Sequence, residues 1–220
     1  MVTIHRLFLA LAGVLLFACV ANADSSPFNN LSASSDGADT VVLAAPLGDS
    51  FSTGANPFNL TSVTVELETG SLQALVPDAI SSPDGSVTMT LLSNAAGTAP
   101  GTVLDTIGTL SDSSVTSTLA DYTFTLSSPY TLAPDTTYWI ELTSDNGSII
   151  FWSYSFDTSG PGVGDQYYID VLGVEPNWDG PYQMAVNGNS AQVPEPGMLL
   201  MLAAGIGAIL LLKSRRTILN

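Results

Sequence analysis

Short runs of strand-forming residues recur along this 220-residue chain, and turn-forming residues separate them. The runs are rich in Val, Thr, Ser and Tyr, and several alternate apolar with polar residues, as Leu60–Leu67 does. They lie at 41–45, 60–67, 87–92, 103–110, 122–126, 137–142, 149–156, 167–172 and 182–186. A spacing of about eight to twelve residues is typical of an antiparallel sandwich, and no window carries an apolar stripe at the helical period. The sequence therefore predicts an all-β domain, an antiparallel β-sandwich that is jelly-roll-like.

Turn residues predict where the strands connect and where the domain ends. Asp145-Asn146-Gly147, between two apolar runs, is the strongest hairpin signal, because Asn and Gly tolerate positive φ. Residues 24–39 are rich in Ser, Asn, Asp and Gly, and predict a flexible leader. We expect the sandwich to occupy residues 40–188 and a short polar linker to occupy residues 189–192.

The first residues have the order of a secretory signal peptide. Arg6 precedes an apolar run at 7–18, and the small residues Ala21-Asn22-Ala23 follow. This order predicts a signal peptide over residues 1–23 that signal peptidase removes. Cys19, the only cysteine, leaves an alternative open. The residues before it loosely match a lipoprotein signal, in which the cysteine would be lipidated.

No Lys or Arg lies between Asp24 and Pro196, whereas all 20 acidic residues lie there. The acids must therefore be solvated, hydrogen-bonded or bridged by cations from the medium. Nucleic acid is excluded as a partner, because nothing in this segment can neutralise phosphate. The segment also has no His or Cys. That absence excludes Ser-His-Asp and Cys-His catalytic groups, Schiff-base lysines and His-based metal sites.

Carboxylates are the remaining acid–base groups. A pair of carboxyl groups can hydrolyse a glycosidic bond if one pKa is raised in a sugar-binding cleft, and Glu66, Glu141 and Glu175 are the candidates. Weak calcium binding is a further hypothesis, because Ca²⁺ takes carboxylate and carbonyl oxygens. The candidate ligands lie in two loops rich in Asp, Asn and Gly: Asp145, Asn146, Asp157 and Asp165. Plain turn residues are the competing interpretation of both loops, and no other cofactor is expected.

Aromatic side chains are concentrated in the C-terminal half of the chain. Exposed aromatic faces can stack on sugar rings, but aromatic rings also build sandwich cores. In Tyr138-Trp139 and Phe151-Trp152, strand alternation points the two neighbouring rings to opposite faces, so some rings should lie off the core. The candidates for stacking on a ligand are Trp139, Trp152, Trp178 and Tyr154.

The C-terminal residues combine a proline motif, an apolar span and a basic cluster. Val193-Pro194-Glu195-Pro196 precedes an apolar run at 198–212, which would be about 22 Å long as a helix. That is shorter than a hydrocarbon core of about 30 Å, so flanking side chains would have to snorkel. Three basic side chains follow the run: Lys213, Arg215 and Arg216. The pattern predicts a single transmembrane helix over 198–212 and a basic tail over 213–216 in the cytoplasm.

Residues 193–216 resemble the PEP-CTERM sorting signal, through the Val-Pro-Glu-Pro motif, Gly197, the apolar span and Lys213-Ser214-Arg215-Arg216. The resemblance implies a precursor held transiently in the inner membrane. It also implies cleavage near Pro194–Pro196 by an exosortase, a membrane-embedded protease or transpeptidase of Gram-negative bacteria. Two prolines keep the motif extended and unpaired, which suits a protease substrate.

The expected sandwich resembles the choice-of-anchor domains, in particular the R type. The resemblance rests on Asp49–Gly54 with Leu60–Val65, on 87–92 with 97–104, and on Leu132–Ile140. It implies a β-sandwich at the cell surface and no known activity. Together the patterns favour an exported, exosortase-processed, non-enzymatic protein with a structural or adhesive role in exopolysaccharide or biofilm. Two alternatives stay open: a carbohydrate-binding module that uses exposed aromatic residues, and a carboxylate-based glycan hydrolase.

Overall fold

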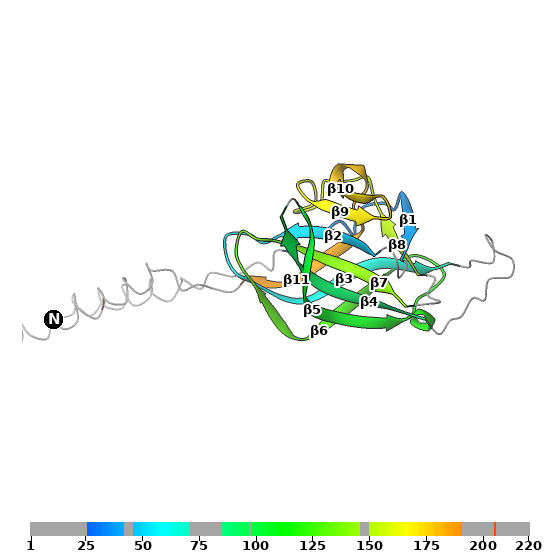
Figure 1. Ribbon diagram of the computed structural model, residues 1–220, viewed down its shortest axis with the longest axis horizontal. Coiled ribbons are helices and arrows are strands. Elements are labelled where there is room, and N and C mark those ends of the chain that lie inside the picture. Colours follow the sequence, from blue (N-terminus) through cyan, green and yellow to red (C-terminus); the bar gives the residue numbers. More distant parts are fainter. Residues whose placement is uncertain are drawn as a thin grey trace, which may run out of the picture.

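Two antiparallel β-sheets pack face to face around one apolar core (Figure 1). The structure, a computed structural model, describes residues 26–41, 46–70, 85–96, 98–145 and 150–190, together with Gly205. Within these ranges, regular structure consists of strands and short 3-10 turns, apart from a helical assignment at Gly205. The predicted all-β, antiparallel sandwich is therefore confirmed.

One sheet is six-stranded, in the order β10-β9-β2-β7-β4-β5. Its strands are β2 (Leu47–Ser52), β4 (Ser86–Ala95), β5 (Ala99–Ser111), β7 (Thr137–Ser144), β9 (Tyr167–Asp170) and β10 (Gly173–Pro176). Most of these strands coincide with predicted runs. β2 and β10 were missed, because Gly, Asp and Ser interrupt the apolar residues of β2, and β10 is the short segment Gly-Val-Glu-Pro.

The other sheet is five-stranded and is built around the long strand β3. Its strands are β1 (Gly37–Thr40), β3 (Phe58–Thr69), β6 (Ala120–Leu132), β8 (Ile150–Tyr154) and β11 (Met184–Ser190). β6 pairs along one side of β3, while β11 and then β8 pair along the other side. Strand alternation in β3 points Val63, Val65 and Leu67 into the core, where all three are fully buried.

The order of the strands is that of a jelly roll. Successive strands from β1 to β8 change sheets at each connection except the β4–β5 hairpin. The result is β1-β8-β3-β6 in one sheet and β2-β7-β4-β5 in the other. β9 and β10 extend the second sheet beyond β2, and β11 lies beside β3 in the first.

The N-terminal segment is part of the folded domain, contrary to the flexible leader predicted for residues 24–39. Phe28 is fully buried, and Asn29 forms a bridge with Ala185 on the free edge of β11. Residues 37–40 form β1. The segment thereby covers backbone that would otherwise be an open sheet edge. The polar composition of the segment did not predict this role, because the segment contributes backbone hydrogen bonds more than apolar side chains.

At the C-terminal end of the domain, β11 runs to Ser190, inside the predicted linker.

The hairpin predicted at Asp145-Asn146-Gly147 is wrong. β7 ends at Ser144 and β8 begins at Ile150, but the two strands belong to different sheets. Asp145 instead binds the neighbouring strand: its Oδ1 accepts the Ser86 N–H at 2.8 Å, and its Oδ2 accepts the Ser86 hydroxyl at 2.9 Å. Local turn signals identify a reversal of the chain, but not the sheet in which the next strand pairs.

Several predicted segments lie outside the described residues. They are the signal peptide (1–23) with Cys19, the sorting motif (193–196), the basic tail (213–216) and the apolar span (198–212), of which Gly205 alone is described. Among the described residues, no helix has the length and apolar character that crossing a membrane requires. The roles expected of these segments stay predictions.

Candidate functional site

The three tryptophans of the domain lie in different environments. Trp139 and Trp152 are fully buried, whereas Trp178 is 72% exposed. The indole N–H of Trp152 donates to the carbonyl oxygen of Gln183 at 3.0 Å, and that of Trp139 donates to Oδ1 of Asn94 at 2.9 Å. The hypothesis that Trp139 and Trp152 stack on a ligand is therefore wrong, because neither ring is accessible. Trp178 keeps that role open.

We give the name aromatic rim to Tyr154 and Phe156, whose rings pack together, and to Trp178, whose segment of the chain lies near them. Tyr154 is half-buried at the end of β8, and its ring centroid lies 5.7 Å from that of Phe156, which is 57% exposed. A Cβ placed on Gly180 would lie 3.3 Å from Phe156 and 3.5 Å from Tyr154. Trp178 precedes Gly180 by two residues, in the short 3-10 helix η3 (Asn177–Asp179). Gly180 therefore places the backbone that carries Trp178 close to the Tyr154–Phe156 pair.

A buried carboxyl group on β2 holds the chain on both sides of Trp178. Asp49 is fully buried. Its Oδ1 accepts the side-chain amide of Asn177 at 3.0 Å, and its Oδ2 accepts the backbone N–H of Tyr182 at 3.0 Å. The same Asn177 amide donates to the carbonyl oxygen of Val163 at 3.1 Å. The segment that carries Trp178 is thus fastened to a central strand at both of its ends.

Asp49 is an unusual residue to find in this core. Burial raises its pKa well above the usual range, although hydrogen bonds from Asn177, Tyr182 and Ser50 act in the opposite direction. Leu47, Asp49 and Phe51 alternate along β2 and share the face that points into the core. That alternation could have identified Asp49 from the sequence, but the residues of β2 were not predicted to form a strand.

Tyr182 connects the aromatic rim to the core beneath it. Its ring stacks on Trp152 with centroids 4.7 Å apart and meets Tyr168 edge-on at 5.9 Å. Its hydroxyl donates to Oδ2 of Asp39 at 2.9 Å. Burial and the nearby Asp39 carboxylate raise the pKa of Tyr182, so the phenol stays protonated at physiological pH. The rim therefore stands on packed, hydrogen-bonded residues, which favours a preorganised binding surface.

The three candidate glutamates for glycan hydrolysis are not brought together. Glu66 lies between the core residues Val65 and Leu67 on β3, so it faces outward. Glu141 faces outward from β7 in the other sheet, and partial burial raises its pKa. Packed sheets are about 10 Å apart, so carboxyl groups on opposite outer faces are separated by more than the 5 to 10 Å or so that hydrolysis requires. Glu175 lies on the edge strand β10.

The predicted calcium ligands that the structure describes, Asp145, Asp157 and Asp165, lie at the ends of strands or in turns. Asp145 binds β4 through both carboxylate oxygens, as described above. Asp157 accepts the backbone N–H of Ser159 at 2.9 Å, and hydrogen bonds from Ser159 lower its pKa. Asp165 is exposed, and Asn146 lies outside the described residues. In the described ranges, no three His, Cys, Asp or Glu side chains form a group that could hold a metal ion. Calcium binding stays a prediction.

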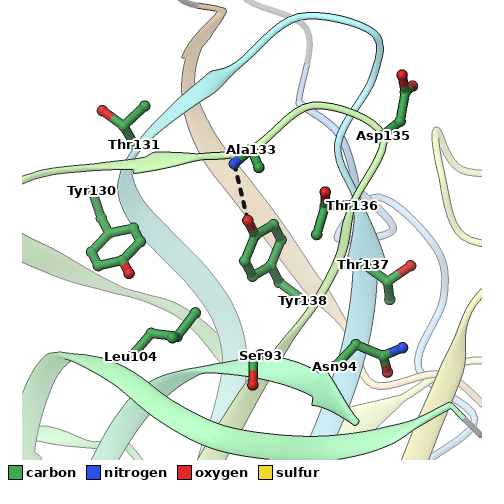
Figure 2. A pocket seen from close by; sticks show the side chains of 10 residues that line it. All are labelled: Ser93, Asn94, Leu104, Tyr130, Thr131, Ala133, Asp135, Thr136, Thr137 and Tyr138. Atoms are coloured by element: carbon green, nitrogen blue, oxygen red, sulfur yellow. Dashed lines mark hydrogen bonds between the residues drawn. The ribbon is translucent and has the colours of Figure 1, made fainter. Parts of the chain in front are cut away.

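An open pocket lies at one end of the sandwich, between strands β4 and β5 and the β6–β7 turn (Figure 2). We name it the end pocket; its volume is about 570 Å³. The residues that line it include Ser93, Leu104, Tyr130, Asp135 and Tyr138. Sequence reasoning did not find it, because its walls come from turns that are distant along the chain.

A comparison with protein-family models finds no match for this chain, and none of the curated proteins matches it. Among solved structures, the chain is similar to a clostridial cysteine protease, Cwp84, after propeptide cleavage. The TM-score is 0.50 at 11% identity, over 74% of this chain and 40% of that chain. The chain thus spans well under half of the protease's length. At this identity the likeness concerns the β-sandwich fold alone.

Proposed function

We propose that this chain is an exported, non-enzymatic protein of the cell surface or extracellular matrix, which adheres to an uncharged polysaccharide through its aromatic rim. The observation that carries the proposal is the pair of exposed rings, Trp178 at 72% and Phe156 at 57% exposure, on a rigid base. Large exposed apolar side chains gathered in one place mark interaction surfaces in soluble proteins. Flat rings fixed in position stack on the apolar faces of sugar rings at little entropic cost.

The charge of the domain supports an uncharged ligand. All 20 acidic residues and none of the four basic residues lie between Asp24 and Pro196. Anionic polysaccharides would be repelled at low ionic strength, and no side-chain cation is present there to pair with them. A neutral glycan meets no such repulsion, and stacking needs no charge.

The C-terminal residues support delivery to the surface. The Val-Pro-Glu-Pro motif, the apolar span and the basic tail suit a membrane-anchored precursor that exosortase cleaves. The mature domain would then reach the cell surface or the extracellular matrix. The candidate carboxylates lie on separate faces, which supports a role in display and adhesion over glycan hydrolysis.

Replacing Trp178 with alanine is expected to weaken glycan binding about tenfold or more, which corresponds to about 1.4 kcal/mol. The reason is the loss of the most exposed stacking face. Thermal stability should change little, because the ring contributes little to the core. Isothermal titration with the glycans found by array screening of the secreted domain (residues 24–192) would measure the loss.

Two comparisons make the binding test specific. Phe156→Ala should also weaken binding, whereas Leu172→Ala should not, since Leu172 is 85% exposed at the β9–β10 turn but is not in the rim. Unchanged affinity in both rim variants would exclude the rim as the site. A wild-type domain that binds no glycan would exclude the proposed function.

Replacing Pro194, Glu195 and Pro196 with alanine is expected to block removal of the C-terminal tail. The extended, unpaired backbone that a protease needs would be lost, because alanine favours helix. The uncleaved form should accumulate in the membrane fraction, which immunoblotting of the producing bacterium would detect. Gln192→Ala is the matched control and should be processed normally. Normal processing of the triple variant would contradict the sorting assignment.

A further inference from the structure

The outer face of the β9–β10 hairpin, at one edge of the six-stranded sheet, is apolar (Figure 1). Tyr168 on β9 packs in the core, so strand alternation points Tyr167 and Ile169 to the opposite face. Val174 pairs with Ile169, and Pro176 pairs with Tyr167, so these two β10 residues share that face. All four side chains are half-buried. We name Tyr167, Ile169, Val174 and Pro176 the edge patch.

The turn that joins β9 to β10 adds two exposed apolar side chains next to the edge patch. Val171 is 67% exposed and Leu172 is 85% exposed. Gly, Asn and Asp are the usual residues of so short a turn, and neither apolar side chain contributes to the core. Oδ1 of Asp170 accepts the backbone N–H groups of Leu172 at 2.7 Å and of Gly173 at 3.2 Å, which fixes the turn. Apolar side chains that are gathered on a fixed surface are typical of an interaction site.

A position without a side chain separates the edge patch from a carboxyl group. Gly48 of β2 pairs with Ile169 on one side and with Glu141 of β7 on the other, so the three residues form one row across the outer face. A Cβ placed on Gly48 would lie 3.2 Å from Cγ2 of Ile169, so the isoleucine side chain leans over the glycine. Neighbouring strands are about 4.8 Å apart, so one bound segment can reach both Ile169 and Glu141.

Glu141 and its neighbour on β4 offer acceptors that no cation of the domain can use. Partial burial raises the pKa of Glu141. Glu141 pairs with Thr90, whose Oγ1 is buried and has no hydrogen-bond partner among the described residues. No Lys or Arg lies between Asp24 and Pro196. A cation with N–H donors, supplied from outside the domain, would therefore stabilise the partly desolvated carboxylate and satisfy the hydroxyl oxygen.

We propose that the edge patch and Glu141 form a docking surface for a segment of another protein in which Lys or Arg stands beside apolar residues. The apolar side chains would pack on Ile169 and Val174, while the cation would bind Glu141 and Thr90. Charge disfavours other occupants, because a second copy of this acidic domain and an anionic lipid surface would both be repelled. The surface shares no residue with the aromatic rim, so the proposal does not rest on glycan binding.

The test uses the secreted domain and three short capped peptides, of alternating Leu and Lys, Ser and Lys, or Leu and Glu. With the Leu–Lys peptide, chemical-shift changes in two-dimensional NMR spectra should appear at Glu141, Ile169 and Val174. The Ser–Lys peptide should bind at least tenfold more weakly, and the Leu–Glu peptide should not bind. Glu141→Gln keeps the shape and removes the charge, whereas Ile169→Thr keeps the branched Cβ and removes apolar surface. Each variant should bind the Leu–Lys peptide at least fivefold more weakly.

Matched controls make these losses specific. Glu68→Gln removes a charge from β3 in the other sheet, and Val103→Thr makes a similar apolar-to-polar change on β5, where Val103 is 59% exposed at the opposite edge. Neither should change the affinity for the Leu–Lys peptide. Equal binding by wild type, Glu141→Gln and Ile169→Thr, or shift changes confined to other surfaces, would overturn the proposal.

Two further measurements separate the edge patch from other interactions. A dimer in sedimentation experiments that Ile169→Thr dissociates would overturn the proposal, because the occupant would then be a second copy of the chain. Trp178→Ala should bind the Leu–Lys peptide normally, and Ile169→Thr should bind glycan normally. Failure of the docking surface and failure of the aromatic rim are therefore distinguishable.

Discussion

Replacing Trp152 with alanine is expected to destabilise the domain by about 3–5 kcal/mol, the usual cost of truncating a large buried aromatic ring. Trp152 is fully buried, and its ring stacks on Tyr182 at 4.7 Å. Its indole N–H is bonded to the carbonyl oxygen of Gln183, which would keep only its hydrogen bond from the Glu66 backbone N–H. The cavity would open where β8 meets both β1 and β3, because Trp152 pairs with Asp39 and with Leu67.

Urea unfolding followed by far-ultraviolet circular dichroism would measure this loss. Trp178→Ala is the matched control, because it removes the same side chain from an exposed position and should shift stability by less than about 0.5 kcal/mol. The two variants should therefore have opposite effects: Trp152→Ala lowers the free energy of unfolding, whereas Trp178→Ala lowers glycan affinity. Equal urea midpoints for wild type and Trp152→Ala would contradict the burial of Trp152 in the core.

Replacing Asp49 with alanine is expected to cost about 2–6 kcal/mol, because two buried donors lose their acceptor and each such loss costs about 1–3 kcal/mol. The donors are the Asn177 side-chain amide and the Tyr182 backbone N–H. Since both flank Trp178, glycan affinity should fall as well, although Asp49 touches no ligand. Urea unfolding would measure the stability, and titration of the folded variant would measure the affinity. An Asp49→Ala variant with the stability and the glycan affinity of the wild type would contradict the role of Asp49 in positioning Trp178.

Asp49 should also give the domain a distinctive dependence of stability on pH. Its folded pKa is raised by burial, whereas in the unfolded chain it returns to about 4. Between those two values the folded state binds more protons, so the free energy of unfolding falls as pH rises. The destabilisation is absent below about pH 4 and complete above the raised pKa.

Asp49→Asn isolates this contribution, because asparagine does not titrate. One of its amide N–H groups would face a donor, so the variant should be less stable than wild type at pH 4, by about 1–3 kcal/mol. That deficit should shrink as pH rises, since only the wild type becomes less stable through this site. Asp121→Asn, on the exposed face of β6, changes net charge equally and corrects for general repulsion among acids. A constant deficit across pH would contradict the raised pKa.

Much of the fold could be predicted because strand alternation is local. Leu60–Leu67 falls within β3, and 87–92 falls within β4, since apolar residues at every second position can bury one face only as a strand. The strands that were missed, β1, β2 and β10, lack that pattern. β1 and β2 are held by pairing with β8 and with β7, and neither partner is adjacent in the chain.

The candidate site was harder to predict, and the tryptophans show why. Alternation indicated that Tyr138 and Trp139 face opposite sides of a strand, but both are buried. Exposure depends on what other segments cover each face, and strand period carries no information about that. Phe156 and Asp49 were passed over for the same reason: one is exposed beside Gly180, and the other is buried against Asn177.

By itself, the sequence determined the all-β class and most strand positions, and its composition predicts that nucleic acid and catalysis by His, Cys, Lys or Arg are excluded. Those conclusions follow from local period and from composition, which do not depend on how the chain folds. Only the tertiary structure decided that the segment after residue 25 closes a sheet edge, that Asp145 does not lead a hairpin, and that Trp178 is the exposed tryptophan. Each of these depends on contacts between residues far apart in the sequence, because burial and pairing are properties of the packed sheets.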